Sequence, residues 1–221
     1  RQLQLELLGE VPVLSIRTEP LQNPVNRLAK RLFDLTFSSL FLLTIFPFIY
    51  LIVGLIIKIT SPGPIFFKQE RNGENGKIFK CYKFRSMKVN ALSDSLQATK
   101  NDPRKTKFGN FLRKSNLDEL PQFINVFKGE MSIVGPRPHM LKHTEEYSQL
   151  INKYMMRHLV KPGITGWAQV TGYRGETKEL SQMEGRVRRD LWYIENWTFL
   201  LDIRIMIKTV TNMFRGEKNA Y

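Results

Sequence analysis

Along most of the chain apolar residues alternate with polar and charged ones, but one long stretch near its start carries no charge. From Leu35 to Ile57 the sequence reads LTFSSLFLLTIFPFIYLIVGLII and carries no charged residue. The hydrocarbon core of a bilayer is about 30 Å thick, and a helix needs about 20 apolar residues to cross it. The stretch is therefore just long enough for a spanning helix, and on length alone this simple interpretation stays open.

A proline and the flanking charges favour a different topology. Pro47 lies in the middle of the stretch, where it removes a backbone donor and clashes with the carbonyl of Leu43. Both flanks are basic: Arg27, Lys30 and Arg31 precede the stretch, and Lys58 and Lys68 follow it. Positive charge marks the cytoplasmic side of a membrane segment. A helix that enters, bends at Pro47 and returns keeps both flanks on that side, so we predict a re-entrant membrane helical hairpin over residues 27–60.

Outside this stretch the pattern predicts an α+β fold that is mostly helical. Residues 1–26 contain one short apolar strand and a proline-rich connector, which we interpret as a linker or the remnant of an upstream domain. Two β-prone runs flank Asn72-Gly73 and Asn75-Gly76, a strong signal for a small antiparallel β-hairpin or sheet. Helical spacing follows over residues 108–115, 119–129, 139–159 and 188–214, whereas 90–107 and 161–177 show little regular pattern. Residues 61–221 therefore form a cytoplasmic domain with amphipathic helices at the membrane interface.

Charge adds a prediction about the partner. The chain has 34 Lys and Arg against 20 Asp and Glu, a formal net charge of +14, and a pI near 10.0. Such an excess predicts a polyanionic partner, which by composition is nucleic acid, an anionic membrane surface or a phosphorylated small molecule. The single cysteine, Cys81, excludes an internal disulfide, and the three histidines lack the spacing of zinc ligands.

The strongest candidate for chemistry is the pair of adjacent acids in SNLDELP. Ser115 followed by Asp118 matches a capping box with Asp in place of Glu, so an ordinary capped helix start is one interpretation. Two acids also suit phosphoryl transfer. One carboxylate can attack phosphorus to form an acyl phosphate, and the second can hold Mg²⁺ against the phosphate oxygens. Asp118 and Glu119 are therefore candidate catalytic residues.

Several cations could complete such a site. Arg137 lies between two prolines, which fix its backbone in an extended form suited to bidentate phosphate binding. Lys83 and Arg85 alternate with Phe84 on the second strand of the hairpin, so they are expected to share one face. Arg113 lies five residues before Asp118, and Arg174 lies in the glycine-rich TGYRGET. Together these residues favour binding of a diphosphate.

Four blocks of the sequence resemble a known family. KRLFDLTFSSLFLL, SPGPIFFKQERNGENGKIFKCYKFRSM, FLRKSNLDELPQFINVFKGEMSIVGPRPHM and KPGITGWAQVTGYRGET are similar to the bacterial sugar transferases, over about residues 27–214. These are monotopic polyprenol-phosphate phosphoglycosyl transferases, which start exopolysaccharide, capsule and O-antigen synthesis at the bacterial inner membrane. The resemblance implies that residues 61–221 are the catalytic domain of a larger member. One departure is Phe46, where members often carry Ser before the proline.

The resemblance also implies roles for individual residues. Asp118 would attack the β-phosphate of a UDP-sugar and release UMP, and undecaprenyl phosphate would then accept the phosphosugar. Glu119 would bind Mg²⁺, and the phosphate oxygens would be bound by Lys83, Arg113 and Arg137, with Arg85 beside Lys83. Gln169 and Arg174 would contact the nucleotide or sugar, and GYRGET resembles members that use UDP-glucose or UDP-galactose. The implied partners are this donor, the lipid acceptor, the phospholipid membrane and a second copy in a homodimer, with no nucleic acid.

Two other functions stay open at this point. A Leloir-type membrane glycosyltransferase would release UDP in place of UMP, and a basic membrane-tethered module would bind anions without chemistry. Four aromatic residues between 192 and 199 suit either the core or a membrane-interface belt. His139 is expected to have a structural hydrogen-bonding role, Asp202 to pair with Arg204 or Lys208, and Asp34 to pair with a nearby arginine. The sequence leaves open whether His139 or Asp202 joins the site.

Overall fold

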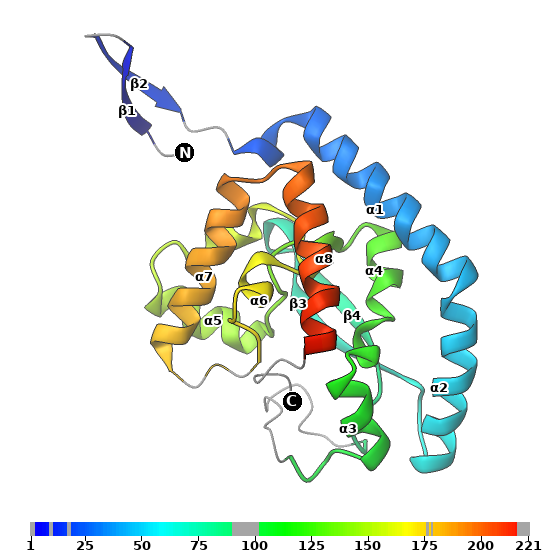
Figure 1. Ribbon diagram of the computed structural model, residues 1–221. Coiled ribbons are helices and arrows are strands. Elements are labelled where there is room, and N and C mark those ends of the chain that lie inside the picture. The colour runs from blue at the N-terminus through cyan, green and yellow to red at the C-terminus, as the bar shows by residue number, and fades with distance from the viewer. Residues whose placement is uncertain are drawn as a thin grey trace.

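The computed structural model of the protein describes residues 3–8, 11–16, 19–89, 102–175, 177 and 179–215. Helices form most of this structure, and the described strands pair into three small two-stranded sheets (Figure 1). The predicted α+β class with mostly helical content is confirmed. Residues 90–101, in the segment predicted to be irregular, lie outside the described part.

The first residues form two strands, where the sequence predicted one. β1 (Leu3–Leu8) pairs antiparallel with β2 (Val11–Ile16), and Leu7 lies opposite Pro12. The prediction of a single strand was wrong, because a second strand pairs with the first and contains Pro12. In a two-stranded sheet each strand is an edge strand, and an edge strand tolerates a proline.

The long uncharged stretch forms two helices separated by a bend. α1 (Pro24–Thr44) is capped by the side chain of Asn23, and α2 (Phe46–Thr60) begins directly after Ile45 with Pro47 in its first turn. The two helix axes differ by 56°. In the described part of the chain no single helix is long and apolar enough to cross a membrane, whereas this bent pair meets the criteria of length and composition jointly. The sequence located the break within two residues, because a proline fits the first turn of a helix but not its interior.

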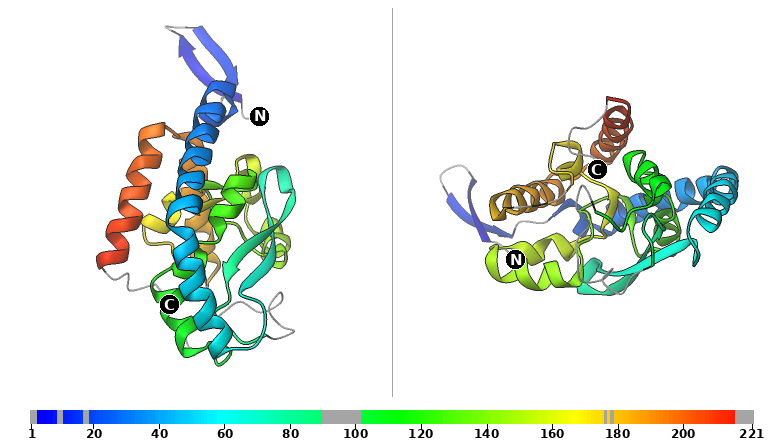
Figure 2. Two further views of the ribbon diagram at one scale, coloured as in Figure 1. Left: turned by 90° about the vertical axis from the view of Figure 1, so that its right-hand side faces the viewer. Right: turned by 90° about the horizontal axis from the view of Figure 1, so that it is seen from below.

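The predicted hairpin is confirmed. β3 (Phe66–Asn72) pairs antiparallel with β4 (Ile78–Phe84), and the short 3₁₀ turn η2 (Glu74–Gly76) connects them. Asn75 and Gly76 have φ values of 55° and 74°, the left-handed conformation that Asn and Gly adopt most readily. Seen from the side of α1, the hairpin lies on one side of this helix and α8 lies on the other (Figure 2).

Two short helices and a 3₁₀ turn follow the hairpin. α3 (Lys107–Lys114), η3 (Leu117–Glu119) and α4 (Gln122–Lys128) are consecutive, and α4 packs against both α1 and β4. Gly129, at φ 85°, ends α4 at the predicted residue. Val126 of α4 is fully buried in the main core cluster, and so is Met131.

The middle of the chain differs from its prediction in two places. The helix expected over residues 139–159 is divided into α5 (Leu141–Leu150) and η4 (Tyr154–Leu159), with Lys153 at φ 63° between them. The segment expected to be irregular contains β6 (Gly163–Thr165) and α6 (Trp167–Val170). β6 pairs in parallel with β5 (Ser132–Val134). These strands have three residues each, too short to produce a periodic pattern.

Two helices complete the fold. α7 (Leu180–Glu195) and α8 (Phe199–Arg215) replace the single helical run predicted there. The four aromatic residues around the junction of α7 and α8 divide equally: Tyr193 and Trp197 are buried in the core, whereas Trp192 and Phe199 are 40% and 41% exposed. The 3₁₀ turn η1 (Pro20–Gln22), which precedes α1, contacts α7.

Candidate active site

The carboxylate pair lies on a turn between two helices. Asn116 has φ 59° and reverses the chain direction after α3, so that Asp118 and Glu119 project from η3. The capped helix start that the sequence left as one interpretation does not form, because Ser115 is the last residue of the turn that ends α3 and its hydroxyl donates to the carbonyl of Phe111 at 2.8 Å. Both acids are buried, with 7% and 8% of their surface exposed.

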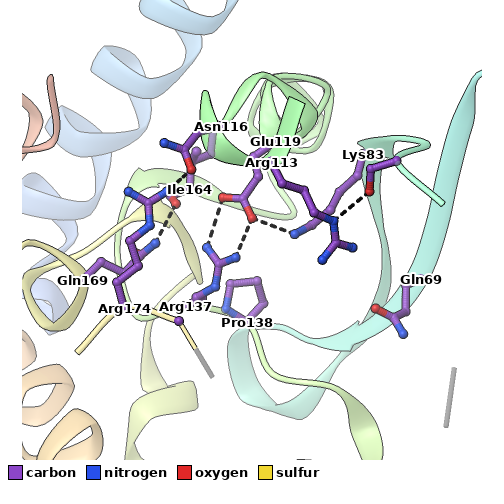
Figure 3. A network of polar contacts seen from close by, with 12 residues as sticks. Gln69, Lys83, Arg113, Asn116, Glu119, Arg137, Pro138, Ile164, Gln169 and Arg174 are labelled. Carbon is purple, nitrogen blue, oxygen red and sulfur yellow. Dashed lines mark hydrogen bonds and ion pairs between the residues drawn. The ribbon is translucent and has the colours of Figure 1, made fainter. Parts of the chain in front are cut away.

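Glu119 is held by two cations. The Lys83 ammonium donates to Glu119 Oε1 at 2.6 Å, and the Arg137 guanidinium binds both carboxylate oxygens, with 3.1 Å between Nη1 and Oε2 (Figure 3). Burial alone would raise the pKa of Glu119, but the charges and hydrogen bonds of Arg137 and Lys83 hold it well below its usual range. Glu119 is therefore ionised at neutral pH, and its position is fixed from two elements of the fold.

The pKa of Asp118 is shifted in the opposite direction. Burial and then the charge of Glu119 raise the pKa of Asp118 to about 6, against the opposing effect of Lys83, Arg113 and Arg137. Among the described residues none donates a hydrogen bond to its carboxylate. At pH 7 most of the Asp118 side chains are still ionised. A desolvated carboxylate without hydrogen-bond donors is a reactive nucleophile.

Two further cations were predicted at the site, and the structure brings only Arg113 close to the carboxylates, not Arg85. Arg113 donates from Nε to the Ser86 hydroxyl at 2.8 Å, and its charge lies close enough to lower the pKa of Asp118. The structure does not bring Arg85 to the carboxylates: its guanidinium donates to the Pro62 carbonyl at 2.6 Å and to the Ser61 carbonyl at 2.5 Å. The expected alternation with Lys83 fails because β4 ends at Phe84.

The glycine-rich segment contributes Arg174 and Gln169 to the site, on the other side of Glu119 from Lys83 and Arg113. Arg174 contacts Asn116 Oδ1, two residues before Asp118. Gln169 is 6% exposed and donates to the Ile164 carbonyl at 3.4 Å, while no described residue donates to its Oε1. In Figure 3 these residues lie to one side of Glu119, and Lys83 and Arg113 lie to the other. The site therefore has two cationic sides with the carboxylates between them.

Comparison with known proteins places this arrangement in a family. A family model described as bacterial sugar transferase matches residues 25–216. The chain belongs to the bacterial sugar transferase family.

Relatives of the chain have consistent names. It is 54% identical over 221 residues to a UDP-glucose:undecaprenyl-phosphate glucose-1-phosphate transferase of Escherichia coli K12, and 49% identical over 223 residues to one of Xanthomonas campestris pv. campestris. These alignments cover 99% and 98% of this chain but 47% and 45% of the relatives, so the chain spans about half their length. It is also 45% identical over 194 residues to the exopolysaccharide production protein PSS of Rhizobium leguminosarum bv. phaseoli, covering 85% of this chain and 96% of that one.

The carboxylate pair offers a limited set of metal ligands. No group of three or more His, Cys, Asp or Glu side chains that could hold an ion occurs in the described part of the chain. Mg²⁺ in phosphoryl-transfer sites uses one or two carboxylates together with substrate phosphates, so Glu119 could serve as the protein ligand. Glu119 Oε2 accepts from Arg137 Nη1 and keeps a second lone pair. The residues fit an ion shared with the donor, where it would neutralise phosphate oxygens.

Sequence reasoning missed a buried network behind Arg137. Arg157 donates to the Arg137 carbonyl at 2.8 Å and to Asp190 at 2.6 Å. His139 Nδ1 lies 2.6 Å from the Tyr154 hydroxyl and also contacts Arg157, which agrees with the expected structural role. Arg157 lies in a charged amphipathic segment and belongs to no recognisable motif, so the sequence did not indicate that it is buried.

The two uncertain aspartates are also placed by the structure. Asp202 pairs with Lys30, so the expected pairing with Arg204 or Lys208 was wrong. Asp34 accepts a hydrogen bond from the backbone amide of Ile133 at 2.9 Å, in place of the expected arginine. Both partners are distant in sequence, and both aspartates attach α1 to the rest of the fold rather than facing the carboxylate pair.

Proposed function

We propose that this protein transfers hexose-1-phosphate from UDP-glucose to undecaprenyl phosphate and releases UMP, as the first membrane step in building a bacterial polysaccharide. The names of its relatives support the donor and the acceptor. The single observation that carries the mechanism is the contrast between the two adjacent acids. Glu119 is held by cations, whereas Asp118 is buried, without a donor among the described residues, and close to three cations.

The first step is a displacement at phosphorus. An Asp118 oxygen attacks the β-phosphorus of UDP-glucose, the bond from phosphorus to the bridging oxygen breaks, and UMP leaves with that oxygen and its electron pair. The product is an acyl phosphate between Asp118 and the phosphosugar. An oxygen of undecaprenyl phosphate then attacks the same phosphorus, which restores the Asp118 carboxylate and forms a lipid diphosphate sugar.

The neighbouring cations give this displacement its electrostatic support. The attack brings an anionic nucleophile toward a diphosphate, so charge repulsion opposes it unless cations lie close by. Arg113, Lys83 and Arg137 lie near Asp118, and two of them are held in position by Glu119. Glu119 would therefore position the cations and contribute to Mg²⁺ binding, with Asp118 as the nucleophile.

A lipid acceptor requires access to a membrane, and the apolar surface supports this part of the proposal. Both α1 and α2 expose large apolar side chains, among them Leu40, Leu43, Phe48, Leu51, Ile52, Leu55 and Ile59. α8 exposes Leu200, Ile207 and Val210. We propose that the bent pair enters the bacterial inner membrane from the cytoplasmic side and returns, with the carboxylates at the interface. Reactivity of single cysteines near residues 30 and 58 toward a membrane-impermeant label tests this, and labelling near 58 from the periplasm would contradict it.

The decisive experiment for the reaction is a donor-only incubation. The purified protein is mixed with UDP-glucose and Mg²⁺, quenched with acid, and its intact mass is measured, while the supernatant is analysed for nucleotides. We expect an adduct with the mass of a hexose phosphate and an equal amount of UMP. Asp118→Asn serves as the control that forms neither. UDP as the sole nucleotide product after adding lipid would favour a Leloir-type glycosyltransferase, and binding without any product would favour a non-catalytic module.

A further inference from the structure

We propose that α7 positions Arg174 for the donor through a clamp on the glycine-rich loop, formed by Arg186, Arg189 and Gly185. The inference rests on the proposed function, because Arg174 acts here as a group that binds oxygen atoms of the UDP-sugar. The clamp residues themselves do not reach the carboxylate pair. They are positioning residues, and they would set donor affinity without taking part in the chemistry.

Arg186 fixes the backbone on both sides of Arg174. Its guanidinium donates from Nε to the Tyr173 carbonyl at 3.1 Å and from Nη2 to the Gly175 carbonyl at 2.9 Å. Arg186 is 7% exposed, so these hydrogen bonds are shielded from water. A planar guanidinium can bind two carbonyls at once, which an ammonium group cannot do in the same geometry. The peptide units that flank Arg174 are thereby tied to one side chain.

The side chain of Tyr173 is held as well. A Cβ atom placed on Gly185 would lie 2.3 Å from Tyr173 Cε1, so the ring packs directly on the helix backbone at a residue that has no side chain. The guanidinium of Arg189 lies 4.0 Å from the ring centroid and donates to the Gly185 carbonyl at 3.3 Å. The ring is therefore enclosed by one turn of α7 and a cation, a favourable cation–π geometry.

With its neighbours fixed, Arg174 is directed at the carboxylate turn. The guanidinium contacts the side chain of Asn116, which lies two residues before Asp118 in η3. Gly172 and Gly175 have φ values of 94° and 97°, which allow the sharp turns on either side of Tyr173 and Arg174. A loop with two such glycines would otherwise sample many conformations, and preorganisation by α7 removes that entropic cost from donor binding.

The test is an equilibrium binding measurement in an Asp118→Asn background, which prevents turnover. Calorimetric titration with UDP-glucose compares Arg186→Lys and Gly185→Ala with Arg188→Lys, an exposed arginine on the same helix. We expect Arg186→Lys and Gly185→Ala to raise the Kd for UDP-glucose about tenfold, the size of one lost charged hydrogen bond. We expect Arg188→Lys to change it less than about twofold, and all three variants to keep cooperative thermal unfolding.

The same measurement in an Arg174→Ala background decides whether the clamp acts through Arg174. If it does, Arg186→Lys and Gly185→Ala cause no further loss of affinity there, because the group they position is already absent. Equal and additive losses in both backgrounds would overturn the inference, and so would unchanged affinity in the first background. Failure of the proposed function appears separately, as absence of the phosphosugar adduct in the unaltered enzyme.

Discussion

The clusters around Asp202 and Asp118 both bury an aspartate close to cations, and they differ in how completely the aspartate is paired. The anchoring cluster consists of Asp202 with Lys30, Tyr193 and Trp197. Its carboxylate accepts from the ammonium, from the phenol at 2.7 Å and from the indole at 3.1 Å. The second cluster, called the catalytic cluster after its proposed role, consists of Asp118, Glu119 and the cations around them; Asp118 is buried as well, but no described residue donates a hydrogen bond to it.

The difference distinguishes a cluster that stabilises the fold from one that we propose to react. A buried charge with all its hydrogen bonds made stabilises one arrangement, whereas a buried charge without them costs free energy in the resting protein. Asp202 attaches α8 to α1, and so joins the bent apolar pair to the core. Asp118 has a raised pKa and accepts no hydrogen bond from the described residues, a combination that occurs at catalytic sites. The same Asp→Asn substitution in the two clusters should therefore have opposite consequences.

The largest expected effect is on transfer activity when Asp118 is changed. Asp118→Asn replaces the attacking carboxylate with a neutral amide, so we expect transfer of hexose-1-phosphate to fall by at least about 1,000-fold in a radiolabelled-donor assay. Because burial disfavours the charged side chain, neutral Asn should leave the melting temperature the same or higher. If Asp118→Asn also lost its cooperative melting transition, the loss of activity would reflect misfolding. That result would contradict the assignment of Asp118 as the nucleophile.

The next largest effect is on stability when Asp202 is changed. Asp202→Asn leaves the Lys30 ammonium buried without its carboxylate, and breaking one partner of a buried ion pair costs about 3–5 kcal/mol. We expect this loss in the free energy of unfolding, measured by denaturant titration in detergent. Lys30→Met combined with Asp202→Asn is the matched control, and it should recover part of the loss. An Asp202→Asn variant with full stability but little activity would place Asp202 in the chemistry instead.

The comparison also explains what the sequence could predict. Asp118 and Glu119 are adjacent in the chain, Lys83 and Arg137 lie in short motifs, and local chemistry pointed to all four. The hairpin turn at Asn75 and Gly76 and the end of α4 at Gly129 are also local signals, and the structure agrees with them. Features encoded within a few residues were therefore predictable.

Long-range pairing was not predictable from the chain alone. Lys30 and Asp202 are 172 positions apart, and the nearer Arg204 and Lys208 were equally plausible partners from spacing. Arg85 was expected beside Lys83, but the end of β4 turns its side chain to the carbonyls after α2. Such choices depend on where distant elements pack, which apolar and charge patterns do not specify.

The smallest of these effects concerns pH and distinguishes the two acids of the catalytic cluster. In the proposed mechanism Asp118 reacts as the carboxylate, and its pKa is raised to about 6 by burial and by the charge of Glu119. As pH falls from 7 to 5 the ionised fraction of such a group drops about tenfold, so the rate of UMP release at low donor concentration should drop by a similar factor. Quenched-flow measurement of UMP release across this range checks the prediction.

Glu119→Gln provides the control for that pH dependence. The substitution removes the negative charge that raises the pKa of Asp118 and leaves Lys83 and Arg137 close by. The pKa of Asp118 should therefore fall, and the acid limb of the pH–rate profile should move to lower pH. The maximal rate should fall as well. A limb that keeps its position in Glu119→Gln would mean that a group other than Asp118 titrates. In that case the Asp118 carboxylate, which accepts no hydrogen bond from the described residues, would no longer explain why the catalytic cluster reacts and the anchoring cluster does not.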